Sequence, residues 1–226
     1  MEQTPACVGI ILDGNRRWAK EKGLPKLEGH REGLLVTLKN IIRATKDCGI
    51  PNLAVFLFST ENWSREGAEV AYLMNLFREQ WKSELTDLGK EGVRVRFVGQ
   101  RERFDPDLQK AMNEIEADTA NNTELTLWAC MSYGGRAEIV DAAKATVTAG
   151  EEITEESLRK HFWSAEMPDP DIIIRTSGEK RLSGFLLWQS AYSELFFIDK
   201  NWPDFSKDDL EGVLKEFAER ERRHGK

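Results

Sequence analysis

The sequence predicts a single-domain α/β protein whose mostly parallel, six-stranded sheet is flanked by helices. The 226 residues suit one domain with one core, covering residues 1–226, and a composition that is 40% hydrophobic and 31% charged excludes a disordered chain. Short apolar runs alternate along the chain with segments of helical periodicity. That alternation is typical of parallel sheets, which bind ligands beyond the carboxyl ends of their strands.

Six short apolar runs account for the predicted strands. Five of them have the length and the β-branched or aromatic content that are typical of buried strands. The six runs are Val8–Leu12, Leu53–Phe58, Val93–Val98, Leu125–Cys130, Ile172–Ile174 and Leu195–Ile198. The run Ile172–Ile174 is the shortest of the six.

The segments between these runs repeat their apolar residues with the period of a helix. One predicted helical face carries Leu34, Leu38, Ile41, Ile42 and Thr45, and another carries Val70, Leu73, Phe77, Trp81, Leu85 and Leu88. Further helices are predicted over Asp105–Thr119, Ala137–Thr148, Thr154–Phe162 and Lys207–Arg222. The last helix begins after Ser206, a capping residue, and carries acidic residues in its first turns, where the helix dipole favours them.

The charge balance and the cysteines exclude several classes of protein. Lys and Arg number 32 against 39 Asp and Glu, so the net charge of −7 disfavours nucleic-acid binding. Three cysteines without CxxC spacing indicate reduced thiols rather than disulfides or a zinc site. The longest apolar run, Leu53–Phe58, is too short to span a membrane, and the start at Met1 lacks the features of a signal peptide. We therefore expect a cytoplasmic protein.

The first predicted strand runs directly into a polar cluster, Asp13–Trp18. Gly14 lets a ligand approach the backbone, Arg17 can bind phosphate oxygens in a bidentate manner, and Asp13 can hold Mg²⁺ against them. This composition predicts an anion site at the carboxyl end of the strand. The alternative is an ordinary strand-to-helix turn with solvated arginines.

Two further polar clusters follow other predicted strands. Phe58–Arg65 combines hydroxyl, carboxylate, amide, indole and guanidinium groups, and Arg175–Ser183 offers two arginines, a lysine and several hydroxyls around one glycine. The second composition suits a phosphate or diphosphate. Glu194, at the start of the last strand, is a candidate second carboxylate for a metal held by Asp13. The alternatives are a polar turn in the first case and an ordinary strand-flanking charge for Glu194.

Several common motifs are absent from the sequence. It has no GxxxxGK[ST], GxGxxG, GxSxG or HExxH motif, which excludes the simple nucleotide-binding, dinucleotide-binding, serine-hydrolase and zinc-protease interpretations. The DDxxD motif of trans-prenyl synthases is absent too, since Asp208–Gly212 lacks the final aspartate.

With these clusters assembled, the chain resembles the cis-prenyltransferases, and within them the bacterial undecaprenyl diphosphate synthases. The matching segments are Asp13–Ala19, Gly29-His30, Phe58–Trp63, Tyr133–Arg136, Arg175–Ser183, Phe185–Leu195 and Trp202–Phe205. The resemblance implies an apolar product tunnel, a homodimer, and Mg²⁺-dependent addition of isopentenyl diphosphate to farnesyl diphosphate. It also implies a cytoplasmic enzyme that makes a cell-wall lipid carrier and touches the inner membrane surface transiently for product release.

The resemblance implies roles for individual residues. Asp13 matches the central catalytic carboxylate, Asp13 and Glu194 match the Mg²⁺ positions, and Asn62 matches the residue proposed to receive or relay the proton lost on condensation. The site for the allylic diphosphate matches Gly14, Asn15, Arg16, Arg17, Trp18, Lys26, His30 and Arg65. The isopentenyl diphosphate site matches Arg175, Arg181, Leu182 and Ser183, while Ser59, Thr60, Glu61 and Trp63 match positions between the substrates. Because an amide is a poor base, we expect Asn62 to position its partners.

Four residues depart from the family pattern. Arg16 stands where bacterial members often have Gly, Lys26 where Arg is common, Glu66 where Pro is usual, and Ser132 where Asn is usual. A lysine binds phosphate only as a point charge, so we expect weaker diphosphate binding at Lys26. At the end of the chain, Arg223-His224-Gly225 resembles an R-x-G ending that reaches a partner subunit's active site in some members.

Three alternative functions stay open on the sequence: a shorter-chain cis-prenyl diphosphate synthase, a non-catalytic subunit that binds isoprenoid diphosphates, and a Mg²⁺-dependent phosphate-ester hydrolase. The joint presence of catalytic and binding residues counts against the subunit, and the absence of a dedicated water-activating pair counts against the hydrolase. Candidates for the tunnel lining are Leu34, Leu38, Ile41, Ile42, Leu73, Phe77 and Trp81, although core packing explains them equally well.

Overall fold

The sheet places its first two strands in the middle. The computed structural model describes residues 4–220, apart from the side chains of residues 80–82. Its strands are β1 (Val8–Ile11), β2 (Asn52–Ser59), β3 (Val93–Val98), β4 (Leu125–Tyr133), β5 (Ile172–Arg175) and β6 (Glu194–Phe197). They form one sheet in the order β3-β4-β2-β1-β5-β6, and every neighbouring pair is parallel. All six predicted strands are confirmed, in a sheet that is parallel throughout.

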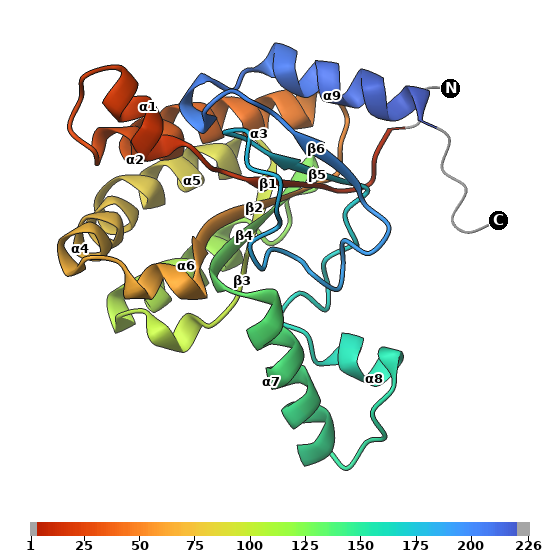
Figure 1. Cartoon of the computed structure of the whole chain (residues 1–226). Helices are drawn as coiled ribbons and strands as arrows, with labels where there is room; N and C mark the ends of the chain where they lie inside the picture. The colour runs from red at the N-terminus through yellow and green to blue at the C-terminus, as the bar shows by residue number, and fades with distance from the viewer. Residues whose placement is uncertain (1–3, 221–226) are drawn as a thin grey trace.

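Helices connect the first five strands, as the periodicity predicts, whereas turns connect β5 to β6 (Figure 1). The helices are α1 (Asn15–Glu21), α2 (Glu28–Glu32), α3 (Leu38–Asp47), α4 (Gly67–Leu76), α5 (Lys82–Lys90), α6 (Pro106–Asp118), α7 (Gly135–Thr148), α8 (Glu155–Lys160) and α9 (Lys207–Glu219). π-helical turns, Gly33–Thr37 and Phe77–Trp81, precede α3 and α5. The predicted last helix ends at Glu219, and residues 221–222 of that prediction lie outside the described part of the chain.

The two faces of the sheet bury different side chains because successive residues of a strand point to opposite sides. Val8 and Ile10 of β1 belong to the larger core, which contains the apolar faces of α3 to α6 and α9. Ile11 belongs to a smaller core on the other face, where Phe185 and Leu186 cover the sheet. The helices are therefore placed to leave the carboxyl ends of the strands accessible.

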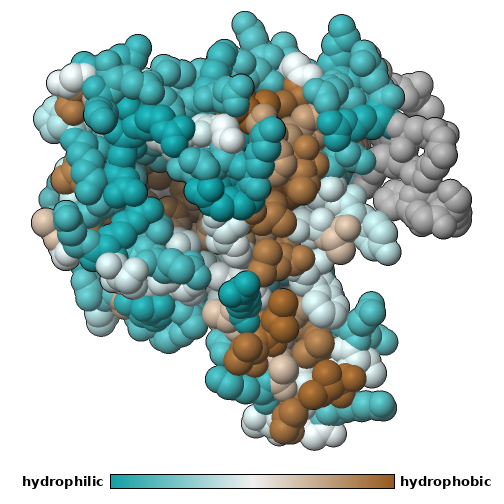
Figure 2. All heavy atoms as spheres, in the orientation of Figure 1, coloured by the Kyte–Doolittle hydropathy of each residue, from teal (hydrophilic) through white to brown (hydrophobic). Residues whose placement is uncertain are grey.

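The α7 and α8 helices project from the rest of the molecule (Figure 1). Figure 2 shows hydrophobic residues along this projecting part. Val140 and Val147 of α7 are 50% and 63% exposed, and Ile153 beyond it is 56% exposed. Among the described helices, none combines the length and the apolar composition needed to cross a membrane.

Candidate active site

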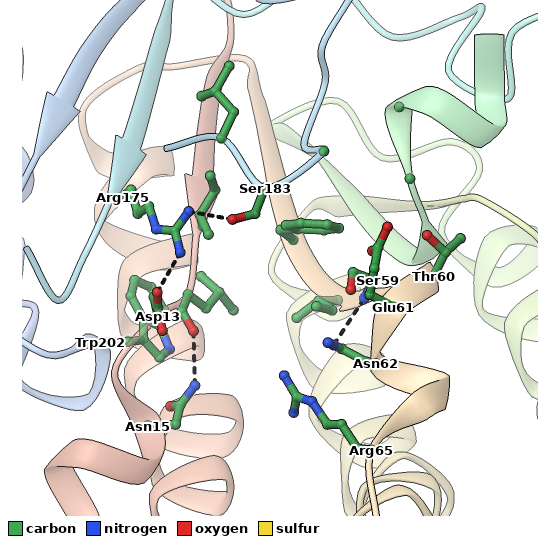
Figure 3. Close-up of a pocket in the computed structure, with 18 of the residues that line it drawn as sticks. Asp13, Asn15, Ser59, Thr60, Glu61, Asn62, Arg65, Arg175, Ser183 and Trp202 are labelled. Carbon is green, nitrogen blue, oxygen red and sulfur yellow. Dashed lines mark hydrogen bonds and ion pairs between the residues drawn. The ribbon is translucent and has the colours of Figure 1, made fainter. Parts of the chain in front are cut away.

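A cavity of about 1090 Å³ lies at the carboxyl ends of β1, β2 and β5, where all three predicted polar clusters meet. Figure 3 shows two walls that face each other across it. The β1–β5 wall comprises Asp13, Asn15, Arg175, Arg181, Leu182 and Ser183. The β2 wall comprises Ser59, Thr60, Glu61, Asn62 and Arg65, with His30 also lining the cavity.

An ion pair between Asp13 and Arg175 is the centre of the β1–β5 wall. Arg175 ends β5, its side chain is 5% exposed, and its Nη2 donates to Asp13 Oδ2 at 2.7 Å. Its Nη1 donates to Ser183 Oγ at 2.7 Å and to the Arg181 carbonyl. The other carboxylate oxygen of Asp13 accepts from the Gly14 N–H at 2.8 Å. Strand ends and backbone groups therefore fix both side chains.

Glycine is required directly after this aspartate. Gly14 has φ +101°, in the left-handed region, and an added Cβ would lie 2.5 Å from Asn201 Oδ1. The backbone then turns into α1. The strand-to-helix turn is confirmed, and the anion site at this turn stays a prediction.

The β2 wall is built on the short 3₁₀ turn Thr60–Ser64. Asn62 Oδ1 accepts from the Ser59 N–H at 3.1 Å, so the amide of Asn62 is oriented by the end of the strand. Trp63 does not line the cavity; its Nε1 donates to Ser132 Oγ at 2.9 Å and its ring packs against Phe58. Ser132 is buried with φ +49°, a backbone conformation for which Asn is better suited than Ser. Trp63 thus anchors the turn rather than contacting the cavity.

A buried carboxylate, Glu69 of α4, gathers the basic groups behind the β2 wall. Its oxygens lie 2.9 Å from Lys26 Nζ, 3.0 Å from Arg65 Nη1, 3.5 Å from His30 Nε2 and 3.7 Å from Arg16 Nη1. Burial opposes ionisation of Glu69, but the Lys26 hydrogen bond and the charges of Arg65 and Arg16 outweigh it and lower its pKa. Burial, followed by the charge of Arg65, lowers the pKa of His30 to about 4. At neutral pH this histidine is therefore uncharged.

Several predicted binding residues lie beside the cavity without lining it. Arg17 donates to the Ser177 carbonyl at 2.8 Å and lies 3.2 Å from Glu179, which also pairs with Arg181 at 2.5 Å. Trp18 Nε1 donates to Asp204 at 2.8 Å. The predicted binding residues that do not line the cavity are Gly14, Arg16, Arg17, Trp18, Lys26 and Trp63.

The predicted second metal ligand, Glu194, lies at the amino ends of the strands, away from the carboxyl ends where Asp13 lies. Glu194 begins β6 and pairs in register with Ile172, three residues before the Arg175 end of β5. At a rise of about 3.3 Å per residue, that places it roughly 10 Å or more along the strands from Asp13. It pairs with Arg220 at 2.6 Å. Within one chain, the prediction that Asp13 and Glu194 share a metal ion is wrong.

The donor set around Asp13 nevertheless fits a magnesium ion. Its side chain is 36% exposed in a cavity also lined by Glu61. In the described residues, no three His, Cys, Asp or Glu side chains gather as a metal cage. Mg²⁺ commonly binds through one or two carboxylates together with substrate phosphates and water, so it needs no such cage. Asp13 is the residue that would hold it.

Two buried carboxylates were not predicted from the sequence. One is Glu69; the other is Glu138, which accepts from Tyr133 Oη at 2.5 Å, from Ser164 Oγ at 2.7 Å and from Gln189 Nε2 at 2.8 Å. This cluster supports the segment after Ser183. The sequence signal for each is a single acidic residue among the apolar positions of a predicted helix, which is too common to identify a site.

Some of the residues predicted to line a product tunnel line this cavity, and others do not. Leu34, Leu73 and Phe77 line it, whereas Leu38, Ile41 and Ile42 are buried in the core and do not line it. The side chain of Trp81 lies outside the described residues, as does the predicted C-terminal motif Arg223-His224-Gly225.

Comparisons with known proteins agree with this geometry. Residues 11–225 match the family model for prenyltransferases of the undecaprenyl diphosphate synthase type. The isoprenyl transferase of Thermotoga maritima is 46% identical, with 98% of this chain and 97% of that protein covered. The ditrans,polycis-undecaprenyl-diphosphate synthase ((2E,6E)-farnesyl-diphosphate specific) of Legionella pneumophila is 44% identical, covering 98% and 95%.

A solved structure agrees as well. Lavandulyl diphosphate synthase from Lavandula x intermedia, in complex with dimethylallyl diphosphate, has a TM-score of 0.93 and 33% identity, with 99% of both chains covered. The sequence, the sheet and the cavity thus all point to one group of enzymes, and this chain belongs to the prenyltransferase family of the undecaprenyl diphosphate synthases.

Proposed function

We propose that this prenyl transferase adds isopentenyl diphosphate units to farnesyl diphosphate with cis geometry in a Mg²⁺-dependent reaction. The product would be a long-chain polyprenyl diphosphate, undecaprenyl diphosphate, for a cell-wall lipid carrier. The observation that carries this proposal is the pairing of Asp13 with Arg175 in a cavity that has basic groups on both walls and apolar side chains between them. Two diphosphates and one isoprenoid chain need such a combination.

Residues of the two walls would act on different parts of the reaction. The allylic carbon–oxygen bond breaks, a carbon–carbon bond forms to isopentenyl diphosphate, and a proton leaves. Arg65 and the first N–H groups of α1 would stabilise the charge on the departing diphosphate, and preorganised donors of this kind are worth about 3 kcal/mol each. Mg²⁺, when bound at Asp13, would supply further charge neutralisation. Arg175, Arg181 and Ser183 would hold isopentenyl diphosphate, and Asn62 would orient the group that receives the proton.

The apolar side of the cavity supports growth of a chain. Leu34, Leu73 and Phe77 offer a surface for the isoprenoid tail, as a tunnel would require. At about 0.8 kcal/mol per buried methylene, each five-carbon unit gains roughly 3–4 kcal/mol on burial. A long product would therefore leave slowly. Release at the inner membrane surface by a cytoplasmic enzyme would solve this problem.

The projecting α7 helix supports a homodimer. Val140, Val147 and Ile153 are at least half exposed, and exposed aliphatic side chains of this kind mark interaction surfaces when they gather in one place (Figure 2). A second copy of the chain would cover them. Analytical ultracentrifugation is expected to show twice the 25.8 kDa of one chain.

The deciding experiment incubates the purified chain with radiolabelled isopentenyl diphosphate, farnesyl diphosphate and Mg²⁺. We expect labelled polyprenyl products that disappear with EDTA and return with added Mg²⁺. Products shorter than undecaprenyl diphosphate would favour the shorter-chain synthase, to which the likeness to lavandulyl diphosphate synthase lends support. Absence of product would contradict the proposal in favour of a binding subunit, and release of phosphate alone would indicate a hydrolase.

A further inference from the structure

Glu69 is an anion placed where an anionic substrate is expected to bind. Its side chain is 3% exposed and it does not line the cavity, whereas its neighbours His30 and Arg65 do. The groups around it come from α1, the segment before α2, α2 itself and the residue that precedes α4 by two positions. Glu69 therefore lies behind the cavity-lining residues His30 and Arg65, and its other partners, Arg16 and Lys26, do not line the cavity either.

The charges of this cluster do not cancel. Arg16, Lys26 and Arg65 are basic side chains, His30 is neutral at pH 7, and Glu69 is ionised because its pKa is lowered. One buried anion thus offsets one of three cations. Glu66, which lies 3.9 Å from Lys26, is 83% exposed, so water screens its charge. Glu69 is the acidic group of the cluster with the least access to solvent.

In the proposed reaction, Glu69 lies close to the place from which inorganic diphosphate must be released. Each condensation leaves inorganic diphosphate beside Arg65 and His30, and it must depart before the lengthened chain can bind there again. Three unopposed cations would hold that product tightly. Resting on the proposed function, we propose that Glu69 is a built-in counter-ion that weakens the hold of this cluster on diphosphate and so speeds release of the inorganic product.

A counter-ion and a merely structural residue predict opposite changes in diphosphate binding when Glu69 is neutralised. If Glu69 only kept the cations in place, its neutralisation would loosen them and weaken diphosphate binding. If it acts as a counter-ion, neutralisation adds a full positive charge to the cluster and strengthens binding. The variant Glu69→Gln separates these effects because the amide oxygen keeps a hydrogen-bond acceptor at the same place while the charge disappears.

The experiment measures binding of inorganic diphosphate to the whole chain by isothermal titration calorimetry, with and without Mg²⁺. We expect Glu69→Gln to lower the Kd of diphosphate about fivefold or more, since a desolvated charge acts strongly at short range. Inhibition of turnover by added diphosphate is expected to strengthen by the same factor. Steady-state turnover is expected to slow after a first rapid cycle, because product release becomes limiting.

Two matched variants provide the controls. Glu66→Gln removes the same charge from an exposed site and is expected to change the Kd by less than about twofold. Glu69→Asp keeps the charge and is expected to bind diphosphate like the unchanged chain. If Glu69→Gln does not fold, Glu69→Ser serves for the same titration, since its small side chain leaves room for water beside Arg65.

The outcomes distinguish the counter-ion from the proposed reaction. An unchanged or raised Kd in the neutral variant would overturn the counter-ion, even if the chain extends farnesyl diphosphate. A lowered Kd without any chain extension would support the counter-ion and contradict the proposed reaction. Failure of either protein to bind inorganic diphosphate would overturn the inference as well.

Discussion

The two walls of the cavity hold their charged groups in different ways. On the β1–β5 wall, Arg175 is 5% exposed and bonds to Asp13, Ser183 and a carbonyl at once, so the sheet and the backbone fix its position. On the β2 wall, Arg65 is 28% exposed and bonds to Glu69 on the next turn of the same segment. The first arrangement fixes geometry, and the second sets the balance of charge.

Replacing Asp13 with alanine breaks the β1–β5 wall at its centre. The substitution removes the residue that would hold Mg²⁺ and leaves Arg175 without its carboxylate partner. We expect kcat to fall at least about a hundredfold while the KM for farnesyl diphosphate changes much less, by analogy with loss of one preorganised group. Steady-state kinetics measures both, and near-normal kcat would show that Asp13 has no catalytic role.

Replacing Glu138 with alanine removes the support behind the same wall. Tyr133, Ser164 and Gln189 would lose their shared acceptor in a buried place, and such unpaired groups cost about 1–3 kcal/mol each before relaxation. We expect the free energy of unfolding in urea to fall by about 3 kcal/mol. Lys144→Ala, an exposed change on the same helix, is expected to alter it by less than about 0.5 kcal/mol. Equal effects of the two variants would refute the supporting role.

Matched arginine-to-lysine changes compare the two walls directly. Lysine cannot reproduce the three simultaneous bonds of Arg175, but it can still place one charge near Glu69 in the position of Arg65. We expect Arg175→Lys to lower kcat/KM for isopentenyl diphosphate about tenfold. Arg65→Lys is expected to raise the KM for farnesyl diphosphate about two- to threefold. Comparable losses would mean that both walls depend on fixed geometry.

The stability of the β2 wall is expected to depend on pH through His30. Because burial lowers the pKa of folded His30 to about 4, the unfolded chain binds more protons between pH 4 and 6.5, and stability rises with pH across this window. Glu69 has a lowered pKa as well, so its protonation in acid adds to the loss of stability. We expect His30→Asn to flatten the curve by about 2 kcal/mol between pH 7 and pH 5, measured by urea unfolding. An unchanged slope would show that folding does not lower the pKa of His30.

Much of the fold and part of the site could be predicted from local pattern. The strands and the polar clusters after β1, β2 and β5 were identifiable because buried strands have a short apolar signature and parallel strands gather their carboxyl ends at one edge. By the same rule, Glu194 belongs at the amino ends of the strands, because it begins β6 instead of following a strand. Glu194 therefore lies with the amino ends of the strands, whereas Asp13 follows the carboxyl end of β1.

Spacing along the chain sets which residues form strands, which form helices, and which chemical groups stand at the turns between them. Which of those groups meet depends on the packing of the folded chain. Asp13 and Arg175 are 162 residues apart, and Glu69 gathers partners from as far as Arg16. Such pairs depend on strand order and helix packing, and no local pattern encodes the distance between them.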